Sequence, residues 1–427
     1  MKLSNSTLAE PRRLQGFTLV EVMVSAALIV IVLGFLLTTV NETQRVITGT
    51  TSRVNQFQSS RVAFEALTRT LSQATLNTYW DMDYDSNTNP TNYRRQSDMH
   101  FYSGPVDKLL ATAGSSSEAT YPGHGVFFQA PLGYTGKYAN PTSPRTRYTA
   151  LSSALNVVGF FVEWSDGIKY AKAPKFIREE EGAKAGERFR FRLIQTLQPT
   201  EAVMLYNNSN YTTLIGSGSP FKNATDWIKV ATGRLSLPPG LDTDYTENPK
   251  NYSRVLAENV VALLILPKLA EKDRDPSEPD ESGLTRDYIY DSRPQTAYEA
   301  IWKNNYNLTT SLTTDQKRQV HQLPPILQVV MVAIDDASGA KLEDYAVKKN
   351  NKEAPEFCNN LFKTPGGKTV RISKFLEDIG EDKAAISPET LAGRLINKDN
   401  SMPTPRMNYR IFSADVQIRG SKWTKIY

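Results

Sequence analysis

The residues able to carry out acid–base, nucleophilic or metal chemistry are few and scattered along this 427-residue chain. Its histidines, His100, His124 and His321, do not fall into the short spacings of metal-binding motifs such as H-E-x-x-H. The single cysteine, Cys358, lies in the polar stretch 357–360 and can form no disulfide within the chain. Neither a phosphate-binding G-x-x-x-x-G-K-[ST] loop nor a G-x-S-x-G nucleophile elbow occurs. These patterns predict no enzyme and no bound cofactor.

The best candidate for a metal site is a run of aspartates. Asp81, Asp83 and Asp85 lie two residues apart, and calcium loops use such spacing because alternate side chains turn toward one cation. However, the sixth position of this run is Ser86 rather than glycine, and the twelfth is Asn92 rather than a bidentate glutamate. Aspartates also form turns, and we favour that interpretation over calcium binding.

One further acidic side chain is notable for its surroundings. Residues 17–40 form an apolar run in which Glu21 is the charged residue. A helix of this length measures about 36 Å and is long enough to cross a bilayer. An ionised carboxylate at that depth costs about 2.5–3.5 kcal/mol, so it is a functional residue by default and needs a partner. Cleavage between Gly16 and Phe17 would supply one, because the new α-amino group is largely cationic at neutral pH.

Two other interpretations of the apolar run are weaker. It is too long for a secretory signal peptide, and the sequence that follows it lacks a small-residue cleavage site. A plain signal anchor leaves Glu21 unexplained. Lys2, Arg12 and Arg13 precede the run, and basic flanks stay on the cytoplasmic side. We therefore expect a single pass through the inner (cytoplasmic) membrane, with the N-terminus cytoplasmic and the C-terminal head periplasmic.

Residues 12–21, RRLQGFTLVE, resemble the N-terminal signal of type IV prepilins and type II secretion pseudopilins. The resemblance implies that prepilin peptidase cuts after Gly16 and methylates Phe17, and that Glu21 guides assembly. It implies as partners that peptidase, other pilin or pseudopilin subunits, the assembly machinery, and a membrane contacted through residues 17–40.

Weaker resemblances extend further along the chain. Residues 61–69 are similar to the helix of J-type minor pseudopilins and W-type pilins. Residues 188–201 and 256–269 resemble the Verru/Chthon cassette protein C family of large pilin-like proteins. These stretches are family signatures and imply an assembly protein without implying a reaction.

The periodicity of the chain predicts an α+β fold. Apolar residues recur every three or four positions from Val46 to Ala74, so we expect one helix from Phe17 to about Leu76. Its second half should pack on an antiparallel sheet with long loops. We expect a leader at 1–16, a transmembrane or filament-core helix at 17–40, its amphipathic continuation at 41–76, and a β-rich head at 77–427.

Strands are expected at 126–130, 155–164, 188–197, 202–206, 255–266, 326–334 and 409–418. The clearest strand alternates strictly from residue 188 to residue 193. This pattern predicts that Phe189, Phe191 and Leu193 face the core and that Arg188, Arg190 and Arg192 face solvent.

The function that the sequence favours is structural. The net charge of +5 is small and dispersed, which argues against nucleic acid as a partner. We expect a minor pilin or pseudopilin that assembles through its N-terminal helix into a type IV pilus or a type II secretion-like filament. The alternative is a membrane-anchored binding or adhesion module that forms no filament.

Overall fold

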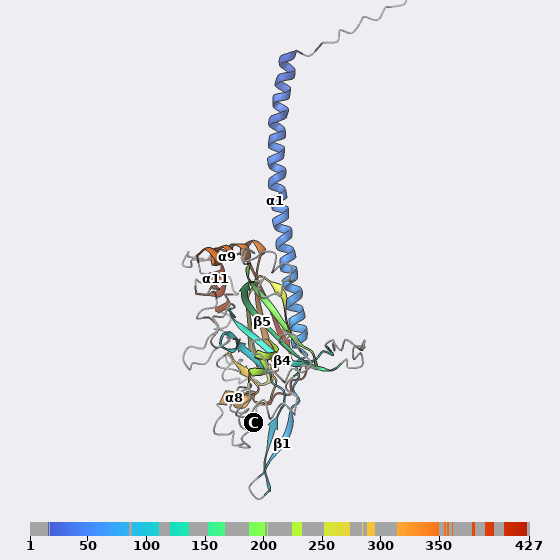
Figure 1. The fold of residues 1–427 in the computed structure, drawn as a ribbon, viewed down its shortest axis with the longest axis vertical. Helices are drawn as coiled ribbons and strands as arrows, with labels where there is room; N and C mark the ends of the chain where they lie inside the picture. Colours follow the sequence, from blue (N-terminus) through green and yellow to red (C-terminus); the bar gives the residue numbers. More distant parts are fainter. Residues whose placement is uncertain are drawn as a thin grey trace, which may run out of the picture. The chain divides into compact units, whose positions relative to one another are not determined.

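The computed structural model describes residues 16, 18–84, 88–110, 120–135, 153–166, 188–200, 203, 224–232, 252–273, 284, 288–294, 314–349, 354–355, 357, 361, 378–380, 389–396 and 405–424. These residues form two compact units, Met1–Asn55 and Gln56–Tyr427. One long helix, α1 (Leu19–Leu71), contributes to both units (Figure 1).

Helix α1 ends at Leu71 rather than near Leu76, because the chain then turns to meet a strand. The backbone N–H of Thr75 donates to the carbonyl of Gln129 at 2.9 Å, which fixes an extended conformation. The predicted apolar stripe is buried over its last turns, at Phe64, Leu67 and Leu71. The ring of Phe64 lies 5.9 Å from that of Phe412. In the first unit, by contrast, the stripe residues Val46 and Val54 are exposed.

All strand pairs of the described residues are antiparallel, which confirms the predicted α+β class. A six-stranded sheet has the order β7 (Ser253–Glu258), β6 (Phe189–Gln198), β5 (Leu155–Asp166), β4 (His124–Pro131), β3 (Tyr102–Pro105) and β9 (Tyr290–Asp291). A three-stranded sheet has the order β11 (Tyr409–Gln417), β10 (Ile326–Ile334) and β8 (Val260–Lys268). Strands β1 (Tyr79–Tyr84) and β2 (Pro90–Gln96) pair only with each other.

The other described elements are short except one. Helix α9 (Asp336–Lys349) follows β10, and the remaining elements are α2 (Asp107–Leu110), α6 (Asp226–Ala231), η3 (Glu271–Asp273), α8 (Thr314–Gln319) and α11 (Leu391–Ile396). The sequence predicted neither α9 nor the strands β1, β2, β3 and β9.

The two larger sheets pack on each other through strand β8, which contacts β3, β4, β5 and β6. The predicted strand 255–266 is in fact two strands, since Asn259 has a left-handed backbone (φ 60°) and separates β7 from β8. Asn259 is therefore the point at which the chain passes from one sheet to the other. Its N–H donates to Phe191 and its carbonyl accepts from Ile334, so each sheet holds one side of the crossing. The prediction at 202–206 lies largely outside the described residues, and Val203 is in no strand.

The expectation that the β6 arginines face solvent is wrong for two of the three. Arg190 and Arg192 are 5% and 3% exposed, whereas the side chain of Arg188 is 53% exposed. The Nη2 atom of Arg190 lies 3.0 Å from an oxygen of Glu343 on α9. Arg192 donates to the carbonyl of Ser165 at 2.7 Å. The alternation found the apolar face correctly, but other parts of the head cover the opposite face.

Removing the carboxylate that pairs with Arg190 should destabilise the head. Glu343→Ala leaves a buried guanidinium without its ion-pair partner, so we expect a loss of about 3 kcal/mol in the free energy of unfolding. Asp344→Ala is the matched control, because the Asp344–Lys348 pair is exposed and should contribute less than about 0.5 kcal/mol. Urea unfolding followed by tryptophan fluorescence measures both. Equal losses would contradict a structural role for the buried pair.

Candidate processing and assembly site

The N-terminus of α1 is capped by a hydroxyl. The Thr18 Oγ1 atom accepts the backbone N–H of Glu21 at 3.3 Å, and the Thr18 carbonyl accepts the N–H of Val22. Threonine at the cap and glutamate three residues later form the T-x-x-E pattern of a capping box. This pattern was visible in the sequence but was not used there. It explains why the helix begins at Leu19.

Hydroxyl side chains in the apolar part of α1 are satisfied within the helix. Ser25 donates to the carbonyl of Val22, and Thr38 and Thr39 both donate to the carbonyl of Phe35. Such local bonds make hydroxyls tolerable in hydrocarbon, because they leave no donor without an acceptor.

The Glu21 carboxylate is different. It is exposed, and no hydrogen bond or ion pair joins it to a described residue of its own chain. The positive end of the helix dipole lies within the first turn and favours a negative charge there, but only by about 0.3–1 kcal/mol. That is less than the cost of an ionised acid in lipid. In lipid, the dipole alone would therefore not offset the charge of Glu21.

Gly16, the expected cleavage-site residue, is exposed, and a Cβ atom added to it would meet no atom within 4 Å. Nothing in the described chain therefore requires glycine at this position. Phe17, the expected methylation site, lies outside the described residues.

The calcium candidate lies at the β1–β2 hairpin. Asp81 and Asp83 belong to β1, where the backbone register pairs them with Arg94 and Asn92. The Asp81 carboxylate accepts the N–H of Met82. Asp85 lies outside the described residues. Within the described ranges, no group of three or more His, Cys, Asp or Glu side chains is arranged to hold a metal ion. Calcium binding here stays a prediction.

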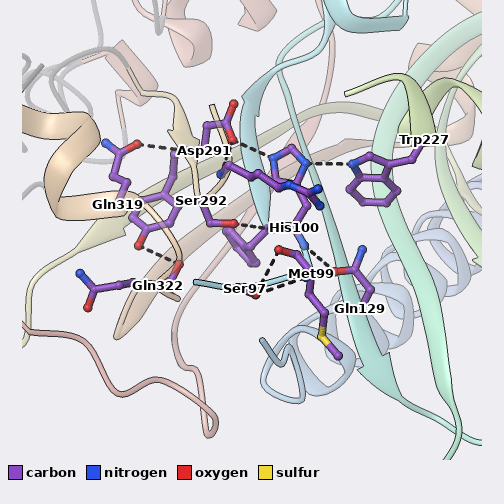
Figure 2. A network of polar contacts seen from close by, with 12 residues as sticks. Ser97, Met99, His100, Gln129, Trp227, Asp291, Ser292, Gln319 and Gln322 are labelled. Atoms are coloured by element: carbon purple, nitrogen blue, oxygen red, sulfur yellow. Dashed lines mark hydrogen bonds and ion pairs between the residues drawn. The ribbon is translucent and has the colours of Figure 1, made fainter. Parts of the chain in front are cut away.

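His100 lies beside a carboxylate, as many catalytic bases do, but both of its ring nitrogens are already hydrogen-bonded. Figure 2 shows His100 between Asp291 and Trp227. Its Nε2 lies 2.7 Å from the Asp291 carboxylate, and its Nδ1 accepts the indole N–H of Trp227 at 2.9 Å. Trp227 donates only, so Nδ1 carries no proton and Nε2 donates to Asp291. Both ring nitrogens of this fully buried side chain are occupied by structural bonds.

The same network ties together distant parts of the head. Asp291 also accepts the N–H of Arg293, while Ser292 accepts the N–H of Phe101. Tyr290 donates to the carbonyl of Gln322 at 3.2 Å. The bonds join the residues just before β3 to β9, to α6 and to the segment after α8, so we interpret the network as a structural clamp.

Trp227→Phe tests the clamp. The change keeps an aromatic ring but removes the donor to His100, and we expect the free energy of unfolding to fall by about 1–3 kcal/mol. Trp80→Phe is the control, since Trp80 is 62% exposed and its loss should change little. Chemical unfolding monitored by far-UV circular dichroism gives both values. A Trp227→Phe protein as stable as the parent would show that the bond is dispensable.

Buried tyrosines make the head sensitive to alkali. Burial raises the pKa of Tyr290, and the pKa values of Tyr288 and Tyr102 are raised by burial and by nearby carboxylates, including Asp378 and Asp291 respectively. The unfolded chain then loses these protons first, at a pKa of about 10. The stabilisation is complete below pH 10 and is lost as the pH rises above it.

Tyr290→Phe should therefore flatten the alkaline loss of stability. Each buried tyrosine removes about 1.4 kcal/mol between pH 9 and pH 11, and the variant lacks one such group. Urea midpoints measured from pH 8 to pH 11 give the slope. An unchanged slope would mean that Tyr290 does not contribute to the alkaline transition.

Comparison with known families identifies the N-terminal segment. Residues 11–37 match the family model of the prokaryotic N-terminal methylation motif. The matched range contains Gly16, Phe17 and Glu21. Comparisons with curated proteins and with solved structures give no significant match. By length and composition, α1 is also the helix among the described residues that could span a membrane.

Proposed function

We propose that this type IV pilin-like protein is a minor pilin or pseudopilin subunit. Its prepilin methylation motif lies at the start of a helix that could anchor it in a membrane. Prepilin peptidase cuts it after Gly16 and methylates Phe17. The subunit then assembles through α1 into a filament of the type IV pilus or type II secretion class. The observation that carries the proposal is the Glu21 carboxylate, which has no partner among the described residues of its own chain.

Cleavage and assembly together would give the Glu21 carboxylate a cationic partner. The cut creates an α-amino group four residues before Glu21, and this group is largely cationic at neutral pH. In a bundle of staggered helices, the amine of one subunit meets the carboxylate of its neighbour. A pair of this kind sets register more than it adds stability, because desolvation cancels much of the attraction.

The proposal assigns a role to each of the other segments of the chain. Residues 1–16 are the leader and residues 17–40 the span through the inner membrane. The head from residue 77 onward stands on the periplasmic side, since basic residues of the leader hold the N-terminus in the cytoplasm.

The first prediction concerns processing. Mass spectrometry of the membrane-derived protein should find an N-terminal peptide that begins with methylated Phe17. Retention of Met1 in the mature protein would contradict the proposal.

The second prediction separates the charge of Glu21 from its place in the capping box. Glu21→Gln keeps a capping-box residue and removes the charge, so we expect normal cleavage but at least a tenfold loss of assembled filament. Thr18→Ala is the matched control, since it removes the cap and keeps the charge. We expect it to reduce helix stability by about 1 kcal/mol and to leave assembly largely intact. Sheared filament fractions, quantified by immunoblot, distinguish the two. Normal assembly of Glu21→Gln would remove the role given to the carboxylate.

A further inference from the structure

The hairpin β1–β2 presents apolar side chains that the chain itself does not cover. Trp80, Met82 and Tyr93 are 62%, 37% and 63% exposed. The two strands pair only with each other, and Figure 1 shows the hairpin reaching beyond the two larger sheets of the head. A lone two-stranded hairpin is marginally stable in water, so an uncovered apolar face on one calls for a partner.

The pairing register places these side chains on one face. Trp80 is opposite Arg95, and Met82 is opposite Tyr93. Directly opposed residues of an antiparallel pair lie on the same side, as do residues two apart in one strand. The Arg95 guanidinium lies 5.9 Å from the Trp80 ring centroid, so a cation borders the aromatic surface. We call Trp80, Met82, Tyr93 and Arg95 the aromatic face.

The base of the hairpin is held to the head by side-chain bonds. Asn77 donates to the Asp98 carboxylate at 2.8 Å, and the Tyr79 hydroxyl lies 3.3 Å from the same group. Arg95 donates to the Thr424 hydroxyl at 3.2 Å. The aromatic face is therefore presented in a fixed orientation, which lowers the entropy lost on binding.

The same chain carries a second uncovered apolar surface, beyond the proposed membrane span. Val46, Ile47 and Val54 of α1 are 65%, 59% and 49% exposed. Positions 46, 50 and 54 are four apart and positions 47 and 54 are seven apart, so these side chains share one side of the helix. We call Val46, Ile47, Thr50 and Val54 the helix face.

By sequence, the segments that carry the two surfaces differ in the sign of their net charge. Residues 41–55 hold Arg45 and Arg53 against Glu42. Residues 79–96 hold Asp81, Asp83 and Asp85 against Arg94 and Arg95. Opposed net charges steer association and penalise wrong partners. They favour a second copy of this chain as the occupant over an anionic lipid surface, which would repel the aspartates.

We propose that the aromatic face of the hairpin in one copy docks on the helix face of α1 in a neighbouring copy. This inference rests on the proposed function, since it assumes that copies assemble side by side. The contact joins two different surfaces, so each copy can offer both at once, and such head-to-tail contacts propagate into helical filaments.

Disulfide trapping in the full-length, processed protein tests the contact. In a Cys358→Ser background, one tagged copy carries Tyr93→Cys and a differently tagged copy carries Ile47→Cys. We expect mixed disulfide dimers on mild oxidation of membranes that contain both. Asp81→Cys, on the other face of the hairpin, and Ser52→Cys, about half a turn from Val54 on α1, are the matched controls. Each should give about tenfold less mixed dimer.

Trp80→Ala supplies the energetic test. Truncating a central aromatic anchor should lower the trapped fraction at least tenfold, whereas Val347→Ala, at an exposed apolar residue of α9, should not. Mixed dimers of equal yield from the control positions, or Tyr93–Tyr93 dimers in their place, would overturn the inference.

A separate readout keeps the two proposals apart. If sheared filaments form as before but trapping fails or Trp80→Ala has no effect, the docking inference is wrong and the proposed function stands. If the unaltered chain forms no filaments and the Tyr93→Cys and Ile47→Cys pair gives no mixed dimers, both are wrong. Binding of the full chain to phosphatidylglycerol vesicles that Trp80→Ala abolishes, with trapping unchanged, would assign the aromatic face to lipid and overturn the inference.

Discussion

An acidic side chain in an apolar helix is the constraint on which the rest of this protein depends. The hydroxyl groups of Ser25 and Thr38 donate to carbonyls one turn back, and Thr18 caps the first turn. Glu21 alone is left with a charge that neither the helix dipole nor a described neighbour neutralises. A helix with this property is incomplete as a single subunit, because hydrocarbon offers a carboxylate no compensation. In the proposed function, cleavage and lateral association are the two events that complete it.

The last turns of helix α1 belong to the core of the head. Phe64, Leu67 and Leu71 are in the same core cluster as the strands of both larger sheets, so these turns cannot leave without exposing that core. Asn259 joins the two sheets through backbone hydrogen bonds, one to each sheet.

The polar groups inside the head serve structure rather than chemistry where the structure describes them. His100 uses both ring nitrogens, and Arg190 pairs with Glu343 from another element. Residues of this kind look functional in a sequence, because the type of a residue does not show whether its side chain is buried and hydrogen-bonded. Their structural role becomes visible only with their partners. For His100 these are Trp227 and Asp291, which lie 127 and 191 residues away along the chain.

The sequence by itself determined the N-terminal signal, the apolar helix, the strands 126–130, 326–334 and 409–418, and the inward side of β6. These follow from local periodicity and from the types of neighbouring residues, which need no tertiary contact. The tertiary structure alone decided that Arg190 and Arg192 are buried, that residues 255–266 change sheets at Asn259, and that His100 is a clamp. Each of these depends on what covers a face or completes a hydrogen bond from far along the chain. Such pairings are set by the packing of whole elements, and no window of local sequence contains them.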